Sequence, residues 1–540
     1  MPNVTFDKRY LMELIRGEVE DRLLAEEAQK MGVEVEAITD SEVKLAITAN
    51  RPDLLDVVGF ARAFRNFTHK AEKFKYSPGH ESRISVKVAE GTPESMPFIA
   101  CIVARGLRLT DESLKGLLNF SDKFCEAYGR RRTKLAMGIY DLLKIGDTLS
   151  YSAYDGTRFA PLGHRKDMAL EEILTDTEQG RQYGGSFKKE QLAMLKDGKE
   201  VLALIPIVNS ERTKITARTT DLLIDITGVN RHAVEGSASL FAASLEDMGA
   251  EIQTVKISYP SGDFSLPSQE ERFLFIPVKV IEAQIGIKIG FNNIISLANK
   301  MGYEAVLVGN KIKFRLPPYR LDILNDQDVI EDIAIAYGYA YIPGVPAQAT
   351  QQGRLEDRSA VNERASSAMV GMGFTEAMNT YLTNEEDNFT KMLCSSKPAE
   401  YVKLSGSKTN TITMLRTCIL PFLLKNLGAS AHESMPQALF EADMVFRMAG
   451  KVPLEEHHLA CVKAGPKTNF NEMKSIAESL LMRLGIEYRI SESTHRHFIP
   501  GRGAKIICKG GEIGSFGEIS PEVLSNFGIE EPCIALEIRI

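Results

Sequence analysis

Long apolar runs are missing from this chain of 540 residues. Nowhere are about 18 apolar residues consecutive, which is the length that a membrane-crossing helix needs. The first residues also lack a basic segment followed by an apolar run, so they do not indicate a secretory signal. We therefore expect a soluble, cytoplasmic protein with no membrane partner.

Patterns that depend on cysteine and histidine are absent as well. The seven cysteines form no Cys-x-x-Cys pair and the nine histidines are not clustered, which argues against a zinc site and for reduced thiols. Cys101, Cys418 and Cys533 stand among apolar residues and are expected to fill cores. The sequence contains no evident Ser-His-Asp or Cys-His arrangement and no phosphate-binding P-loop.

The charge balance does not favour nucleic-acid binding by the chain as a whole. The net charge is -7, whereas phosphate contacts need clustered lysine and arginine. One local cluster exists, formed by Arg130-Arg131-Arg132 with Lys123 and Lys134. This cluster is either a solvated loop or a contact to nucleic-acid phosphates.

The sequence does contain a concentration of acids after Pro317-Pro318-Tyr319-Arg320. Asp328, Glu331 and Asp332 stand at i, i+3 and i+4 of a predicted helix, so their carboxylates share one face. Asp322, in the loop before the helix, can fold back toward them. Such a cluster needs a cation or an arginine, and hard oxygen ligands suit magnesium. The other interpretation is a capping box, with Asp328 as the N-cap and Glu331 three residues later, and with Arg320 neutralising a remaining charge.

Two buried strands are predicted to carry polar side chains that apolar packing does not explain. The apolar run Val201–Val208 ends in Asn209 and Ser210, and a second apolar strand carries Asp225 and Thr227 on one side. A carboxylate in an apolar strand is costly unless it is paired. Asp225 is therefore either a ligand-recognition group or the cap of the helix that follows.

Several different short motifs follow one another along the chain. The motifs are Asn50-Arg51-Pro52-Asp53-Leu54-Leu55, Gly138-Ile139-Tyr140-Asp141-Leu142, Ile205-Pro206-Ile207-Val208-Asn209-Ser210, the acidic segment 317–332, Met414-Leu415-Arg416-Thr417, Leu439-Phe440-Glu441 and Pro500-Gly501-Arg502. In this order they resemble the beta subunit of phenylalanine-tRNA ligase in its short archaeal and eukaryotic form. One departure is visible, because the family often carries histidine where Tyr140 stands.

The predicted fold class is α+β with four modules, as chain length also suggests. Residues 1–75 form an N-terminal module, and 83–262 resemble an editing, tRNA-binding-like module. Residues 265–346 resemble a DNA-binding-like, winged-helix-like module that carries the acidic motif. Residues 353–540 resemble a degenerate, non-catalytic class II synthetase module built on an antiparallel sheet.

The resemblance implies roles for two groups of residues. Magnesium would be bound at Asp322, Asp328, Glu331 and Asp332. An editing pocket that hydrolyses tyrosine wrongly attached to the phenylalanine tRNA would hold Asn209, Ser210, Asp225 and Thr227. A positioned water, not an enzyme nucleophile, is expected to attack the ester.

The resemblance also implies partners. A separate alpha subunit would bind ATP and charge the tRNA, with two alpha and two beta chains in the complex. The last module lacks the arginine and glycine-rich patterns that charging requires, so Arg416 and Arg502 are not expected to be catalytic. Two alternatives remain open, a structural scaffold with an inactive editing pocket and a free-standing hydrolase of mischarged tRNA.

Overall fold

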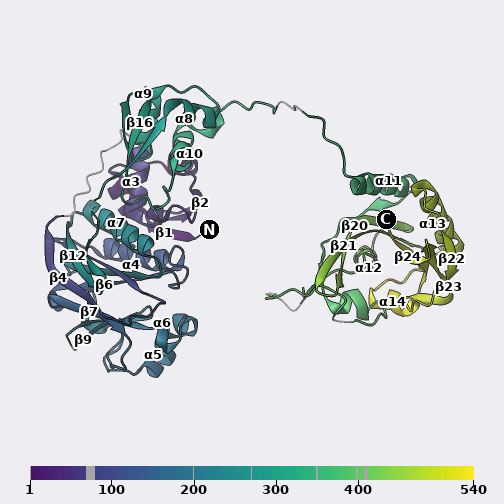
Figure 1. Cartoon of the computed structure of the whole chain (residues 1–540), viewed down its shortest axis with the longest axis horizontal. Helices are drawn as coiled ribbons and strands as arrows, with labels where there is room; N and C mark the ends of the chain where they lie inside the picture. Colours follow the sequence, from purple (N-terminus) through teal and green to yellow (C-terminus); the bar gives the residue numbers. More distant parts are fainter. Residues whose placement is uncertain are drawn as a thin grey trace. The chain divides into compact units, whose positions relative to one another are not determined.

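The computed structural model divides the chain into two compact units, Met1–Pro346 and Ala347–Ile540, each of which is considered by itself (Figure 1). It describes residues 2–68, 79–198, 200–268, 270–347, 351–396, 399–406 and 411–540. The module boundary predicted near residue 75 lies outside these residues, as do residues 348–350 between the third and fourth predicted modules. Both units mix helices with sheets, so the α+β expectation holds at this level.

The N-terminal part of the first unit is a small three-stranded sheet with helices. Asp7 ends the first strand and caps the first helix, its side chain accepting a hydrogen bond from the backbone N–H of Tyr10 at 2.8 Å. The strand order is β1-β3-β2. The elements are β1 (Asn3–Asp7), α1 (Lys8–Ile15), α2 (Asp21–Lys30), β2 (Glu34–Ile38), β3 (Glu42–Ala46) and α3 (Val57–Thr68).

The third part of this unit repeats the same element order. Its strands are arranged β14-β16-β15, again with the first strand next to the third. The elements are β14 (Arg272–Pro277), α8 (Val278–Ile285), α9 (Phe291–Lys300), β15 (Glu304–Val308), β16 (Lys311–Leu316) and α10 (Asp326–Tyr337). Charged and apolar residues alternate strictly along Lys311–Leu316, which predicts a half-buried strand. This prediction is confirmed, because exposed or intermediate residues alternate with buried ones along β16.

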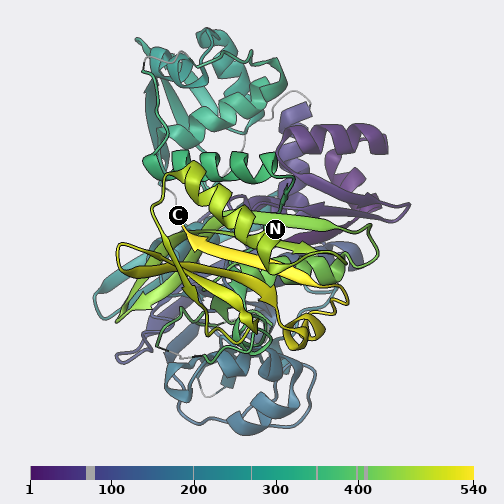
Figure 2. The same cartoon turned by 90° about the vertical axis from the view of Figure 1, so that its right-hand side faces the viewer.

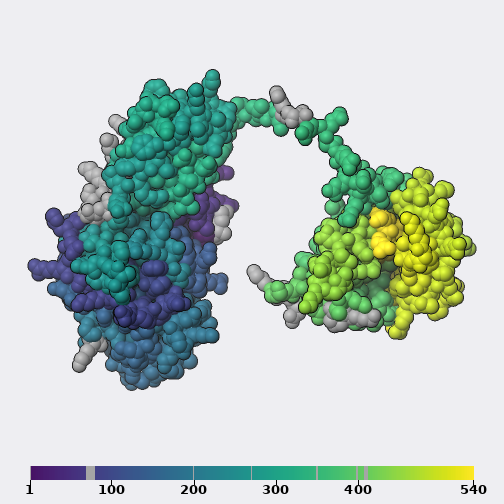
Figure 3. All heavy atoms as spheres, in the orientation of Figure 1, coloured from purple at the N-terminus to yellow at the C-terminus, as the bar shows by residue number. Residues whose placement is uncertain are grey.

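Between these parts lies a ten-stranded sheet in the order β10-β9-β8-β7-β4-β12-β5-β11-β6, with β13 paired to β12. Helices α4 (Asp111–Glu126) and α7 (Arg231–Asp247) pack on β5, β6 and β11. Phe120 of α4 stacks on Phe241 of α7 with ring centroids 4.3 Å apart. Figure 3 shows the atoms of the first unit as one continuous body.

The strands of this large sheet place the polar residues discussed below. Strands β6 and β9, which lie far apart in the strand order, contact one another, so the sheet curves strongly enough to bring its two ends together. The strands are β4 (Glu81–Val88), β5 (Phe98–Arg105), β6 (Leu135–Asp141), β7 (Thr148–Ala153), β8 (Ala193–Asp197), β9 (Glu200–Ile205), β10 (Val208–Asn209), β11 (Leu222–Gly228), β12 (Glu251–Tyr259) and β13 (Gly262–Leu266).

The single strand predicted over Val201–Val208 is wrong in one respect. The run breaks after Ile205, and β10 turns back to pair antiparallel with β9, Val208 lying opposite Leu204. Proline has no N–H to donate to a strand ladder, and the turn at Pro206 is closed by the N–H of Ile207, which donates to the carbonyl of Leu204 at 2.7 Å. The break brings Asn209 back over the sheet.

The second unit is built on a seven-stranded sheet in the order β17-β20-β21-β25-β24-β23-β22. All pairs are antiparallel except β17 with β20. The main strands are β20 (Gln437–Ala449), β21 (Val452–Ala464), β23 (Phe498–Cys508), β24 (Gly511–Ile519) and β25 (Cys533–Arg539), with short β17 (Thr375–Glu376) and β22 (Arg489–Glu492) at the edges.

Helices cover both faces of this sheet. Alternate residues of β21 and β25 belong to two separate hydrophobic clusters, one that includes α12 (Leu420–Ala429) and one that includes α11 (Asp357–Gly371) and α13 (Phe470–Leu484). Figure 2 shows α11 and α13 in front of the strands, where they contact each other. The antiparallel sheet therefore has two cores, one on each face.

Candidate functional site

One pocket in the ten-stranded sheet gathers three of the four residues predicted for ligand recognition. Asp225 and Thr227 reach it from β11, and Asn209 reaches it from β10. Gly138 and Tyr140 of β6 line it as well. We call this space, lined by these five residues with Arg132, the Asp225 pocket. Ser210 lies outside it, because its side chain caps the short helical turn that begins at Glu211.

The carboxyl group of Asp225 is the most unusual group in the Asp225 pocket. Its residue is 1% exposed, and burial raises the pKa of the carboxyl to about 7, against smaller lowering effects from the Tyr140 hydroxyl and the backbone N–H of Gly138. One oxygen, Oδ2, has no hydrogen-bond partner among the described residues. A carboxyl group poised near neutral pH with a spare oxygen is suited to binding a polar ligand group.

Capping does not account for Asp225. Helix α7 is capped by Asn230, whose side chain accepts from the N–H of Ala233 at 3.0 Å. The capping alternative is therefore wrong for Asp225, which lies in the middle of β11 opposite Gly138. A strand interior is a costly place for an acid that has no structural task.

Tyr140 is the partner of Asp225. Its hydroxyl donates to Oδ1 of Asp225, and the tyrosine is completely buried. Burial together with the neighbouring carboxylate raises the pKa of the Tyr140 phenol well above its usual value. Gly138 makes this contact possible, because a methyl group at that position would collide with the Tyr140 hydroxyl and with the Asp225 carboxylate.

Thr227 and Asn209 are positioned in the pocket by the strands that carry them. Thr227 is fully buried and its hydroxyl donates to the carbonyl of Ala136 at 3.4 Å. Asn209 is partly exposed and stands at the end of the short β10 strand. Sequence reasoning did not assign Gly138 or Arg132 to this pocket, although the glycine next to a buried tyrosine in the motif 138–142 was a usable signal.

The basic run ends in a tight left-handed turn beside the pocket. Arg130, Arg131 and Arg132 have φ values of 50°, 52° and 65°, a region that costs a non-glycine residue free energy. Arg132 turns inward, donates to the carbonyl of Ile207 at 2.9 Å and lies over the ring of Tyr183 at 4.1 Å. Arg130 and Arg131 are exposed, so two cations remain available at the surface.

The acidic segment is joined by an arginine. Arg320 is 1% exposed and bridges Asp322 and Asp332, each at 2.7 Å. The hydroxyl of Tyr303 donates to Asp332 at 2.5 Å. The interpretation in which an arginine neutralises part of the cluster therefore describes this geometry.

The other two acids of the segment have different surroundings. Asp328 accepts hydrogen bonds from the N–H groups of Leu324 and Asn325, at 2.7 and 2.9 Å. The capping box exists, but Asn325 is the N-cap and Asp328 is the third helical residue, one turn earlier than the pattern predicted. Glu331 is exposed.

The donor types of this segment fit a hard cation, whereas the side-chain positions fit a cap and an ion pair. In the part of the chain that the structure describes, no three acidic, histidine or cysteine side chains are grouped closely enough to hold a metal ion. Arg320 pairs with two of the four acids, Asp322 and Asp332.

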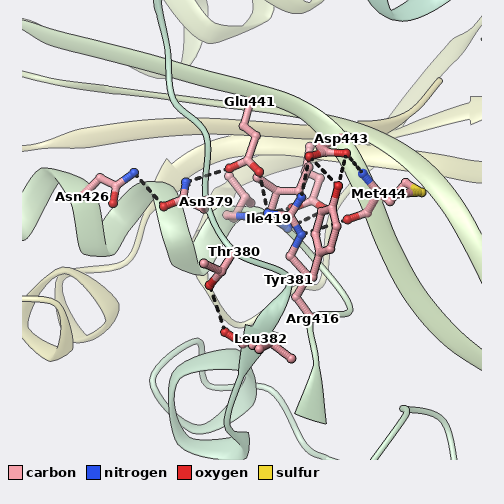
Figure 4. Close-up of polar contacts among 12 residues, drawn as sticks. Asn379, Thr380, Tyr381, Leu382, Arg416, Ile419, Asn426, Glu441, Asp443 and Met444 are labelled. Carbon is pink, nitrogen blue, oxygen red and sulfur yellow. Dashed lines mark hydrogen bonds and ion pairs between the residues drawn. The ribbon is translucent and has the colours of Figure 1, made fainter. Parts of the chain in front are cut away.

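In the second unit, the motif residues Arg416 and Glu441 form a buried ion pair at 2.5 Å. They are 0% and 2% exposed, and Figure 4 shows Tyr381, Asp443 and Asn379 around them. The Nε of Arg416 also donates to the carbonyl of Met444 at 2.8 Å. This arginine is thus engaged in holding β20 to the preceding loop.

Three family models match the chain, and they define the class of protein. The B3/4 domain matches residues 127–246, the tRNA synthetase B5 domain matches 274–339, and the phenylalanyl-tRNA synthetase beta chain CLM domain matches 342–540. The descriptions of the second and third models name a tRNA synthetase, and that of the third names its beta chain. No helix among the described residues is long and apolar enough to cross a membrane.

Full-length relatives identify the family. The phenylalanine-tRNA ligase beta subunit of Archaeoglobus fulgidus is 34% identical over 100% of this chain and 98% of the relative. That of Methanocaldococcus jannaschii is 33% identical over 100% of both. The chain belongs to the phenylalanine-tRNA ligase beta-subunit family, as its motifs predicted.

A solved structure supports the first unit. The crystal structure of an N-terminal fragment of the phenylalanyl-tRNA synthetase beta subunit from Pyrococcus horikoshii matches with a TM-score of 0.60 and 29% sequence identity. The match covers 62% of this chain and 99% of that fragment. The similarity therefore supports a mixed helix-and-sheet fold like that of this fragment.

Proposed function

We propose that this beta subunit proofreads, by hydrolysing tyrosine wrongly attached to the phenylalanine tRNA at the Asp225 pocket. The observation that carries the proposal is the hydrogen bond between Asp225 and a phenol, that of Tyr140. The pocket already accommodates the functional group that distinguishes tyrosine from phenylalanine. Asn209 and Thr227 add polar groups at the same place.

Selectivity follows from the buried carboxyl. A site built to hydrogen-bond a substrate hydroxyl rejects the analogue that lacks it by about 10⁴–10⁵-fold, because the buried polar group is then left unpaired. An apolar pocket discriminates far less against an added hydroxyl. Asp225 therefore gives a physical reason for releasing tyrosine and keeping phenylalanine.

The hydrolytic step is assigned to a positioned water. The residues that line the pocket include no serine, cysteine or histidine, and the hydroxyl of Thr227 already donates to the carbonyl of Ala136. Asn209, which is partly exposed at the end of its strand, is suited to orient a water or the ester. Its role is positioning of the reacting groups.

The test is deacylation of tyrosine-charged and phenylalanine-charged phenylalanine tRNA by the complex of this chain with its alpha subunit. The proposal expects faster release of tyrosine, and an Asp225→Ala variant that loses most of that release. An Asn209→Ala variant should lower the rate for tyrosine while leaving charging of phenylalanine unchanged. Equal survival of both esters would contradict the proposal.

The partners follow from family membership. We propose an alpha subunit that binds ATP and charges the tRNA, in a complex of two alpha and two beta chains. The four-module division into 1–75, 83–262, 265–346 and 353–540 is part of this proposal. Arg130 and Arg131, exposed beside the pocket, are proposed to hold the phosphates of the tRNA acceptor end.

Magnesium is proposed at the acidic start of α10, by Asp322, Asp328, Glu331 and Asp332. The support is that Arg320 pairs with two of these four acids, and that this ion prefers oxygen donors. Magnesium should raise the melting temperature of the native chain and have no effect on a variant with Asp328→Asn and Glu331→Gln. An equal shift in both proteins would contradict the site.

A second function is favoured by one observation. The cavity in the Asp225 pocket that water-sized groups can occupy is about 10 Å³, about the room that a single water needs. A scaffold with an inactive editing pocket would look like this. It predicts that no variant of this chain releases tyrosine while the complex still charges phenylalanine.

A further inference from the structure

The Asp225 pocket is too small for the group that it is proposed to bind. Its free volume is about 10 Å³, whereas pockets for small-molecule ligands span roughly 300–1,000 Å³. A tyrosyl ring cannot enter such a space. Either the pocket has no ligand, or something that belongs to the chain is filling it.

Tyr140 is the group that fills it. Its residue lies on β6 two positions from Gly138, and its hydroxyl reaches Asp225 on the neighbouring strand. The phenol end of the ring lies in the space above Gly138, where even a methyl group would collide with it. The ring of Tyr140 therefore occupies the space that a side chain at position 138 would take.

The chemistry of this contact is that of the proposed substrate. The phenol ring of Tyr140 is buried in the pocket, and its hydroxyl donates a hydrogen bond to Oδ1 of Asp225. The tyrosyl group of a mischarged tRNA would present the same ring and the same donor. Oδ2 of Asp225 has no partner among the described residues, so the carboxyl could accept a hydrogen bond from a second phenol. The pocket has no room for a second ring while Tyr140 is in it.

We propose that Tyr140 is an internal surrogate of the substrate, which occupies the side-chain site of the Asp225 pocket and must leave before a tyrosyl group can bind. This inference rests on the proposed proofreading function and adds the residue that controls access to it. Tyr140 competes with the substrate for Asp225 and so sets both the rate and the selectivity of the site. Because it acts by occupying the site, we treat it as a specificity residue and not as a catalytic one.

The first experiment measures binding of the side-chain analogue 4-methylphenol, without tRNA or hydrolysis. The native complex should bind neither 4-methylphenol nor toluene, and the Tyr140→Ala complex should bind both. In that variant 4-methylphenol should bind about tenfold more tightly than toluene, which corresponds to one hydrogen bond to a buried group. The double variant with Asp225→Ala should lose this preference.

A second variant protects the test against misfolding. Should Tyr140→Ala fail to fold, Tyr140→Leu keeps an apolar filler and still removes the phenol end of the ring. It should bind 4-methylphenol more weakly than the alanine variant but more tightly than the native complex. Binding to the native complex as tight as to either variant would overturn the inference.

The second experiment is deacylation of tyrosine-charged tRNA by the same complexes. Tyr140→Ala should release tyrosine about tenfold faster than the native complex, since a competing hydrogen bond has been removed. Tyr140→Phe, which keeps the ring without the bond, should give an intermediate rate. Tyr259→Phe is the matched control, because its hydroxyl bonds to the backbone of Ile99 outside the pocket, and it should leave the rate unchanged.

The two experiments separate this inference from the proofreading proposal. If Tyr140→Ala binds 4-methylphenol but no complex releases tyrosine, the surrogate is supported and proofreading fails. If the native complex releases tyrosine as fast as Tyr140→Ala and binds 4-methylphenol equally well, proofreading stands and the surrogate is overturned.

Discussion

At the scale of single residues, Asp225 and Glu441 are buried acids with different surroundings. Asp225 is held in β11 next to a phenol, and burial raises the pKa of its carboxyl to about 7. Glu441 is held against Arg416 at 2.5 Å in the second unit. Asp225 has an oxygen without a partner among the described residues, whereas Glu441 is paired with Arg416. Replacing Asp225 should therefore stabilise the chain at neutral pH, and replacing Glu441 should destabilise it.

Asp225→Asn should make stability less dependent on pH. The folded carboxyl holds its proton up to about pH 7, whereas the unfolded group, with an ordinary pKa of 3.8, has lost it well below that. The native contribution to stability is therefore complete below about pH 4 and is lost as pH rises to about 7. Tyr140, Tyr151 and Cys101 lie on the surrounding strands and stay neutral in this range, because burial raises the pKa of each.

Urea unfolding at pH 5 and pH 8 measures this effect. We expect the asparagine variant to gain stability relative to the native protein at pH 8 and to lose that advantage at pH 5. Glu90→Gln, at an exposed turn, is the control and should change nothing. Parallel pH curves for the native protein and Asp225→Asn would contradict the buried-acid account.

Glu441→Ala should destabilise the second unit strongly. Removing one partner of a buried ion pair leaves an uncompensated charge and costs about 3–5 kcal/mol. The exposed Glu455 on the neighbouring strand provides a control, since Glu455→Ala should cost less than about 0.5 kcal/mol. Thermal unfolding monitored in the second unit would contradict the account if both substitutions had equal effects.

At the scale of elements, local patterns predicted much and missed the long-range pairings. The run of small residues from His232 to Met248 predicts a helix, and α7 spans Arg231–Asp247. The alternation at 311–316 gave the burial of β16 correctly. Periodicity reports which face of an element is buried. It is blind to the order of strands in a sheet, which non-local contacts decide.

The Asp225 pocket shows this limit clearly. Asp225 and Thr227 could be placed on one side of a strand, but Tyr140 meets Asp225 across 85 residues of sequence. The strand-helix-helix-hairpin-helix order occurs twice, at 3–68 and at 272–337. This repeat was also missed, because few residues are identical at matching positions of the two segments. Even so, Arg51 with Asp53 and Arg320 with Asp322 form matching ion pairs at 2.8 and 2.7 Å.

Substitutions in the left-handed turn at Arg130 and Arg131 should affect stability and tRNA binding in opposite directions. Replacing Arg130 and Arg131 by glycine removes the cost of a positive φ, about 1 kcal/mol at each position, and should raise the melting temperature. The same variant should bind phenylalanine tRNA more weakly, and the slope of log affinity against log salt should fall by about 1–2. Unchanged tRNA affinity and salt slope would contradict a phosphate contact.

At the scale of the whole molecule, the two units carry different surfaces. The first unit holds the Asp225 pocket and the exposed arginines. In the second unit, large apolar side chains are exposed on the paired helices α11 and α13, with Val370 at 59% and Met482 at 74%. Exposed apolar residues on neighbouring elements are typical of a protein interface, here proposed for the alpha subunit.

A charge placed on these helices should weaken assembly without unfolding the chain. We expect Val370→Glu with Met482→Glu to reduce co-purification with the alpha subunit, because a buried interface does not tolerate unpaired charge. Leu143→Glu, at a residue 75% exposed in the first unit, is the matched control and should assemble normally. Loss of assembly in the control alone would place the interface elsewhere.

The central claim is that Asp225 recognises a tyrosyl hydroxyl and that Tyr140 occupies its place. The most direct measurement compares release of tyrosine and phenylalanine from phenylalanine tRNA by the native, Tyr140→Ala and Asp225→Ala complexes. The account predicts release of tyrosine only, fastest for Tyr140→Ala and slowest for Asp225→Ala. Equal rates for the three complexes, or equal loss of both amino acids, would contradict it.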